Sequence, residues 1–204
     1  HMGAGEYRFA GRKARVFRLS FSGELAFELA VPARFGERVI EALTQAGAVP
    51  YGVEALGVLR IEKGHPAGGE LNGQTTARDL GMGRLMSSKK DFIGRAMTQR
   101  AALQAPDRPG LVGLRPVDKA SRLRAGAHLL PLGAPARIEH DQGWMTSVAH
   151  SPNLDSWIGL GLLAGGLVRI GEWVRAYDPV RNGDVEVEVV PPCFIDPQGA
   201  RLRA

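Results

Sequence analysis

The chain has 204 residues, 44% of them hydrophobic, with charges of both signs spread along it. This is enough for one large or two small domains with a real core, and it excludes a disordered chain. The net charge is +5, but there is no basic block with interleaved aromatics, so we expect no nucleic-acid partner. The longest apolar stretch, residues 157–168, carries four glycines and is too short to span a bilayer, so we expect no membrane partner.

A single cysteine, Cys193, excludes an intrachain disulfide and a cysteine-based zinc site. A chain without disulfides fits a reducing compartment, and we expect a cytoplasmic location. No histidine has a His or carboxylate partner at metal-ligand spacing on one helix, so we predict no metal site. The leading His1-Met2 pair is typical of a cloning remnant, and we expect further natural sequence upstream.

The first half of the chain predicts alternating strands and helices. Residues 14–31 predict a hairpin, because two apolar runs flank a turn signal at Ser22-Gly23. Residues 33–46 predict an amphipathic helix with Phe35, Val39, Ile40 and Leu43 on one face.

Two further helices are predicted before the pattern changes. Residues 53–63 predict a helix that Gly64 ends, and residues 95–103 predict a short one.

The pattern changes after the Pro- and Gly-rich stretch at residues 105–110. The runs LVGL, HLLPL, ARIEH, WMTSVAH, WIGLGLL, WVRAY and VEVEVV are short, strand-like and separated by turn residues. Such spacing is typical of a small antiparallel barrel or sandwich. The predicted fold class is therefore α+β followed by all-β, with domains at residues 3–104 and 110–204.

Two glycine-rich stretches are similar to nucleotide-binding motifs, but neither has the features that such a motif requires. GLGLLAGG at residues 159–166 lies between strand-like runs and does not open a helix, so we predict a barrel strand with small residues. GGELNGQTT at residues 68–76 lacks the lysine of a phosphate-binding loop.

Two carboxylates, Glu24 and Glu28, lie in the run SGELAFEL. On one strand their spacing of four would place them on the same face. They form either a solvated strand face or a pair of acceptors for a ligand with N–H donors.

From this run onward, several motifs resemble in order those of glycine-cleavage aminomethyltransferases. The matching segments are SFSGELAFELAVP, YGVEALGVLRIEKGHP, KKDFIGR, GLVGL and WMTSVAHSP. The ending CFIDPQGARLRA resembles the branch formed by the alpha subunits of heterotetrameric sarcosine oxidases. The likeness covers about residues 14–204, and it corresponds to the second half of an aminomethyltransferase-like folate-binding domain followed by a small antiparallel β-barrel.

This resemblance implies a set of cofactor-binding residues. Glu28 falls on the glutamate that binds the pterin ring, and a carboxylate can accept two N–H bonds from its amino-pyrimidine edge. Phe21 stands where the transferases have Tyr, and Leu56 where they have a folate-contacting Arg. Arg60 is the Arg that remains in that helix, and Arg84 replaces a Trp. No catalytic residue is identified.

The resemblance also implies a function for the parent enzyme. Sarcosine would be oxidised at a flavin in another subunit, and its one-carbon unit would pass to tetrahydrofolate in this domain. FAD, FMN and NAD would bind only in other parts of the parent enzyme. The expected partners are the other sarcosine oxidase subunits, the missing N-terminal part of the chain and small-molecule folate. Two alternatives are a glycine-cleavage-type aminomethyltransferase and a non-catalytic assembly module of the same fold.

Overall fold

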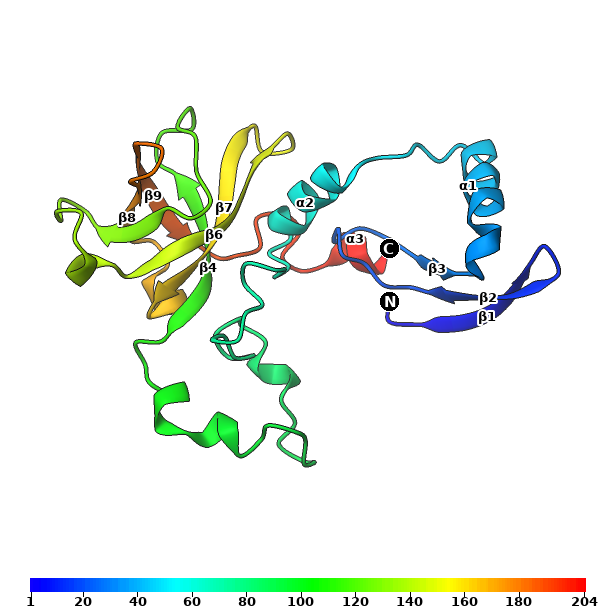
Figure 1. Ribbon diagram of the computed structural model, residues 1–204, viewed down its shortest axis with the longest axis horizontal. Helices are drawn as coiled ribbons and strands as arrows, with labels where there is room; N and C mark the ends of the chain where they lie inside the picture. Colours follow the sequence, from blue (N-terminus) through cyan, green and yellow to red (C-terminus); the bar gives the residue numbers. More distant parts are fainter. The chain divides into compact units, whose positions relative to one another are not determined.

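The structure is a computed structural model that describes residues 1–204, and it divides into two compact units. The first unit comprises His1–Arg60 with Asp196–Ala204, and the second comprises Ile61–Ile195. Figure 1 shows the strands of the first unit in blue and the barrel of the second from green to orange. The domain boundary that we place at residues 104–110 stays a prediction, because packing units and family domains need not coincide.

The first unit contains a three-stranded antiparallel sheet in the order β1-β2-β3. Its strands are β1 (Ala4–Phe9), β2 (Arg12–Phe17) and β3 (Glu28–Ala30), and its helices are α1 (Gly36–Gln45), α2 (Val53–Glu62) and α3 (Ala200–Arg203). Helix α2 runs past the end of this unit into the second.

The hairpin predicted for residues 14–31 is partly right. Strand β2 does pair with β3, but the loop of residues 18–27 joins them instead of a tight turn at Ser22-Gly23. The tight hairpin lies earlier, between β1 and β2, where Ala10 and Gly11 have φ angles of 48° and 73°. Two successive positive φ angles are typical of the two-residue turn whose twist matches that of the strands.

The two predicted helices of this region are present. A 3₁₀ turn, η1 (Ala33–Phe35), precedes α1, and Val39 is the only buried residue of α1. Helix α2 ends before Gly64, which has a φ of 71°. A side-chain Cβ at Gly64 would lie 2.4 Å from the Pro192 carbonyl oxygen, so this stop requires glycine.

The second unit is built around a closed six-stranded antiparallel barrel in the order β4-β7-β6-β5-β8-β9. The strands are β4 (Pro109–Pro116), β5 (His128–Pro131), β6 (Gly143–Ser151), β7 (Ser156–Ala164), β8 (Trp173–Asp178) and β9 (Gly183–Val190). The predicted fold class, α+β followed by an antiparallel barrel, is thereby confirmed.

Two of the predicted elements in this unit are wrong. The run ARIEH is not a strand: its last three residues form the 3₁₀ turn η5 (Ile138–His140). The helix expected at residues 95–103 is broken into η3 (Met97–Gln99) and η4 (Ala101–Leu103), with Arg100 extended between them. Two further 3₁₀ turns are η2 (Gly83–Leu85), which lies upstream, and η6 (Gly166–Arg169), which follows β7.

Two glycines of β7, Gly159 and Gly161, lie against large side chains in the barrel interior. A Cβ at Gly159 would lie 2.4 Å from Met145 Cε, and one at Gly161 would lie 2.8 Å from Leu114 Cδ1. Both glycines therefore leave room for the large side chains that fill the barrel. The barrel-strand prediction for this stretch is confirmed.

The other face of β7 is buried as well. Ile158, Leu160 and Leu162 pack in a second cluster with Ile61 of α2 and with Leu80 from the segment after α2. This segment thus covers part of the outside of the barrel.

Gly143, at the start of β6, provides a test of barrel packing. Its φ is 142°, and a Cβ would lie 1.9 Å from the Leu162 carbonyl oxygen of β7. We expect Gly143→Ala to lower the free energy of unfolding by about 2–4 kcal/mol, through backbone strain and a clash with the neighbouring strand. The matched control is Gly133→Ala, where φ is 72° but the space is open, and it should cost about 1 kcal/mol. Urea unfolding measures both, and equal losses would contradict the clash.

Candidate functional site

Glu28, the predicted pterin-binding residue, begins strand β3 and lies opposite Phe17 of β2. Its side chain is exposed, and its carboxylate has no hydrogen-bond or ion-pair partner within the chain. Both oxygens are therefore available to an external donor.

Glu24 has a different environment, which corrects the prediction that the two carboxylates share a strand face. Residue 24 precedes β3 and lies in the loop of residues 18–27. Its Oε1 accepts a hydrogen bond from Arg201 Nη1 at 3.0 Å, within the same compact unit. The two glutamates of SGELAFEL are thus chemically distinct, one paired and one available.

The other predicted cofactor residues lie on three different elements. Phe21 is an exposed aromatic ring in the loop of residues 18–27. Arg60 lies in the last turn of α2 and is half-buried. Arg84 is exposed in η2 and belongs to the second unit, whereas the other three belong to the first. Their assignment to folate stays a prediction.

The structure reveals a buried carboxylate at the end of α2 that the sequence reasoning missed. Glu62 is 3% exposed, and its carboxylate accepts hydrogen bonds from Ser151 Oγ of β6 and from Asn153 Nδ2, the latter at 3.0 and 3.1 Å. Its carbonyl oxygen accepts the backbone N–H groups of Phe194 and Ile195 at 2.8 and 3.1 Å. Arg60 and Lys63 flank it in sequence, so no local signal marked Glu62 as buried.

A second buried carboxylate, Glu70, was also missed. It is fully buried and accepts hydrogen bonds from Thr146 Oγ1, from Ser147 Oγ at 2.7 Å and from the Ala67 N–H at 2.8 Å. Its hydroxyl partners Thr146 and Ser147 lie 76 and 77 positions away in sequence, so no local signal marked this residue. Glu62 and Glu70 together bind the end of α2 and the segment after it to one barrel strand.

Asp79 and Arg108 form a third, charged anchor. Arg108 donates from Nη2 to Asp79 Oδ2 at 2.5 Å and from Nε to Oδ1 at 3.0 Å, while the Thr76 N–H donates at 2.8 Å. Burial by itself raises the pKa of Asp79, but the hydrogen bonds from Arg108 and Thr76 outweigh it and hold the pKa below the usual aspartate range. The pair joins the loop before η2 to the start of β4.

A pocket of about 250 Å³ lies on the barrel beside a histidine–carboxylate pair. His128 Nδ1 and Asp141 Oδ2 are 2.8 Å apart, and Leu130, Ile138 and Tyr177 line the space around them. No group of three histidine, cysteine or carboxylate side chains is placed to hold a metal ion. None of the helices combines the length and apolar character that crossing a membrane requires.

Two family models match the chain, one after the other along the sequence. The GCVT N-terminal domain model matches residues 1–90, and the glycine cleavage T-protein C-terminal barrel domain model matches residues 110–196. The chain belongs to this aminomethyltransferase-like family.

Its relatives include subunits of larger enzymes. The sarcosine oxidase subunit alpha of Rhizobium meliloti (strain 1021) is 48% identical over 192 residues, which is 92% of this chain and 20% of that protein. That of Corynebacterium sp. (strain U-96) is 40% identical over 199 residues. An aminomethyltransferase of Synechocystis sp. is 32% identical over 93% of this chain and 49% of that protein. The chain thus spans about a fifth of the first relatives and about half of the last.

A solved structure confirms the fold. The crystal structure of glycine cleavage system aminomethyltransferase T from Bartonella henselae matches with a TM-score of 0.74 and 23% identity. The match covers 90% of this chain and 50% of that one.

The Asp79–Arg108 pair gives a pH-dependent prediction. Because the pKa of Asp79 is lower in the folded protein, the pair stabilises the fold above about pH 4. That contribution is lost as the pH falls through the folded-state pKa. We therefore expect Asp79→Asn to reduce the free energy of unfolding by about 2–4 kcal/mol near neutral pH and by clearly less at about pH 3.

The matched control is Asp107→Asn, which changes an exposed neighbour and should stay within about 0.5 kcal/mol. Urea unfolding at both pH values measures the two variants. An Asp79→Asn loss that is equally large in acid would mean that packing, not the ion pair, carries the effect.

Proposed function

We propose that the chain is the folate-binding C-terminal part of a sarcosine oxidase alpha subunit, where the one-carbon unit of oxidised sarcosine passes to tetrahydrofolate. The observation that carries this proposal is the available carboxylate of Glu28, in the segment that resembles the family's pterin-binding run. The 48% identity to a sarcosine oxidase alpha subunit supports the branch of the family.

The side chains of Glu28 and Phe21 are of the types that a planar ligand with N–H donors on one edge requires. A carboxylate offers two acceptor oxygens in one plane, which suits the paired donors of an amino-pyrimidine. The exposed ring of Phe21 supplies an apolar surface on which such a ring can stack.

The role proposed for this chain is one of binding and positioning. Tetrahydrofolate supplies the nitrogen that accepts the one-carbon unit, and Glu28 would hold the pterin so that this nitrogen faces the incoming group. Arg60, which belongs to the same unit as Glu28, would add positive charge for the anionic part of the folate. The flavin and nicotinamide cofactors would lie in other parts of the parent enzyme, in a cytoplasmic assembly.

Exposed apolar side chains in the first unit support a partner for that unit. Phe21, Leu25, Phe27 and Leu29 are each more than 40% exposed, with Phe27 at 60%. Apolar groups exposed together commonly mark an interaction surface. We propose that other subunits, or further sequence of a longer chain, cover them.

A glycine-cleavage-type aminomethyltransferase is the second candidate. Relatives with that name are 30–37% identical to this chain and support it. The departures at Phe21 and Leu56 and the higher identity to sarcosine oxidase subunits favour the first proposal. A non-catalytic assembly module is the third candidate. It is favoured by the loss of a folate-contacting Arg at Leu56 and of a Trp at Arg84.

Replacing Glu28 tests the site directly. Glu28→Gln keeps the size and one acceptor but places a donor against a donor of the ligand. We expect the affinity for tetrahydrofolate to fall by about ten- to a hundredfold, from the loss of a charged hydrogen bond and the introduction of an unpaired donor. Calorimetric titration measures this, with the chain alone and within the complete subunit assembly.

The matched control is Glu24→Gln, which removes an exposed ion pair with Arg201 and should change the affinity by less than about twofold. If Glu28→Gln binds tetrahydrofolate as tightly as the parent, the site assignment is wrong. If the parent itself binds none in the complete assembly, the assembly-module reading replaces the proposal.

A further inference from the structure

A second pocket lies on the stretch of residues 78–100, which we call the basic loop. It is a pocket of about 220 Å³ within the second compact unit. Arg78 and Arg95 line it, together with the hydroxyl side chains of Ser87 and Ser88. None of these residues is among the predicted folate contacts.

The two arginines are weakly engaged by the rest of the protein. Arg95 reaches Asp91 only at 4.0 Å, and the aspartate side chain is 89% exposed. Arg95 Nη1 also donates to the Lys90 carbonyl oxygen at the long distance of 3.5 Å. Arg78 has no side-chain hydrogen bond or ion pair within the chain. Most of their N–H groups therefore remain for a ligand.

The serines add further donors. Ser87 Oγ accepts the backbone N–H groups of Lys89 and Lys90 at 3.2 and 3.1 Å, so its lone pairs are occupied and its own proton is available. Ser88 Oγ forms no hydrogen bond within the chain. No carboxylate lines the pocket. The lining thus offers many more donors than acceptors.

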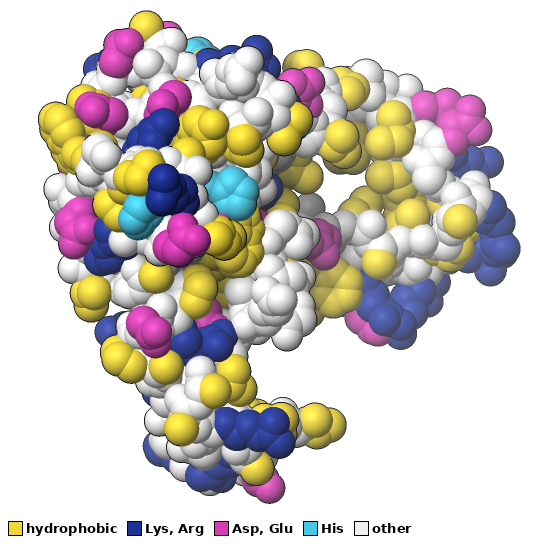
Figure 2. Space-filling view, turned by 60° about the vertical axis from the view of Figure 1, so that its left-hand side comes forward, with side chains coloured by type: hydrophobic (Ala, Val, Ile, Leu, Met, Phe, Trp, Pro, Cys, Tyr) yellow, Lys and Arg dark blue, Asp and Glu magenta, His cyan; other side chains and the backbone are white.

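The charged residues around the pocket are mostly basic, which fits its arginine lining. The basic loop carries six Lys and Arg residues against two aspartates, and one of these, Asp79, is already bonded to Arg108. Figure 2 shows Lys and Arg side chains gathered on the lobe at the bottom of the view, with little acidic surface beside them. Such a field attracts anions and raises their local concentration.

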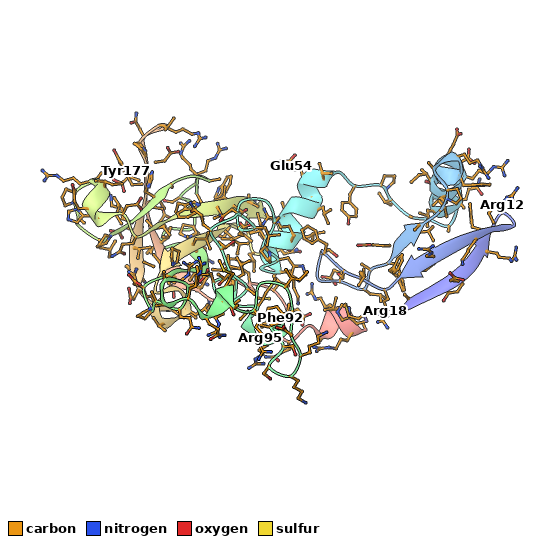
Figure 3. All side chains as sticks on the ribbon, turned by 60° about the horizontal axis from the view of Figure 1, so that its bottom comes forward. Arg12, Arg18, Glu54, Phe92, Arg95 and Tyr177 are labelled. Carbon is orange, nitrogen blue, oxygen red and sulfur yellow. The ribbon has the colours of Figure 1, made fainter.

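One wall of the pocket is apolar. Phe92 and Met86 line it beside the arginines. Figure 3 shows the labelled Phe92 and Arg95 close together on this loop. An apolar wall next to guanidinium groups suits an anion with a carbon skeleton.

We propose that this pocket binds a small organic molecule through an oxyanion group held between Arg78 and Arg95, with its carbon skeleton against Phe92. Guanidinium groups bind carboxylate and phosphate oxygens through paired hydrogen bonds. The pocket is smaller than the roughly 300–1,000 Å³ that holds a drug-sized ligand, so the ligand is small or only its charged end enters. The apolar wall favours a carboxylate over a free phosphate.

Calorimetric titration of the full chain tests this, with glutarate, its uncharged diamide and inorganic phosphate as the three probes. We expect saturable binding of glutarate, no binding of the diamide, and weaker binding at high salt. Arg78→Gln and Arg95→Gln should each weaken glutarate binding by about tenfold or more. Arg95→Lys, which keeps the charge but loses the fork, should lie between the parent and Arg95→Gln.

The matched control is Arg100→Gln, because Arg100 is exposed on the same loop but does not line the pocket. Its effect should stay within about twofold. Phosphate bound more tightly than glutarate would keep the oxyanion site but assign it to a phosphate ligand. An equal loss in Arg100→Gln, or no binding of either anion to a chain with the parent's circular dichroism, overturns the proposal. The assay contains no folate, so its outcome is independent of the Glu28 test.

Discussion

The arrangement of the second unit depends on two buried carboxylates. Glu62 and Glu70 are buried, and a buried carboxylate without hydrogen bonds would cost several kcal/mol, on the order of the whole stability margin of a domain. Hydroxyls of β6 satisfy both. Because those hydroxyls sit on one barrel strand, the carboxylates can be buried only when the segment after α2 lies against that strand. Burial of the two carboxylates therefore fixes the position of this segment on the barrel, in addition to its effect on stability.

Other features follow from that constraint. Once the segment after α2 lies on the barrel, Ile61 and Leu80 cover the outer face of β7. Asp79 then meets Arg108, and this ion pair closes the base of the basic loop. The loop itself has few buried residues and is held mainly at its ends, which leaves its arginines facing solvent.

The sequence predicted those parts of the structure that local pattern determines. Helices α1 and α2 follow from apolar periodicity with Pro and Gly boundaries, and β9 follows from strict alternation of valine with acidic residues. The pairing of β2 with β3 was also predictable, but the tight turn at Ala10-Gly11 was not, because no Asn-Gly or Asp-Gly signal marks it. The contacts of Glu62 and Glu70 span about 76–91 positions in sequence, and no local pattern encodes such pairing. The folate site at Glu28 was proposed from the resemblance of its sequence segment. No sequence motif marks the pocket lined by Arg78 and Arg95, which only the fold brings together.

The contrast between the two sheets has a consequence for how the chain behaves in concentrated solution. The barrel is closed and has no free strand edge, so it offers no template for strand addition. The three-stranded sheet has two edges, β1 and β3. Strand β1 carries Glu6 and Arg8, charges that discourage unwanted pairing, while β3 is short and Pro32 lies two residues after its end. Charged side chains thus protect the edge at β1, and the short length of the strand protects the edge at β3. A partner strand can add to β3 over a few residues, but a fibril cannot readily grow from it.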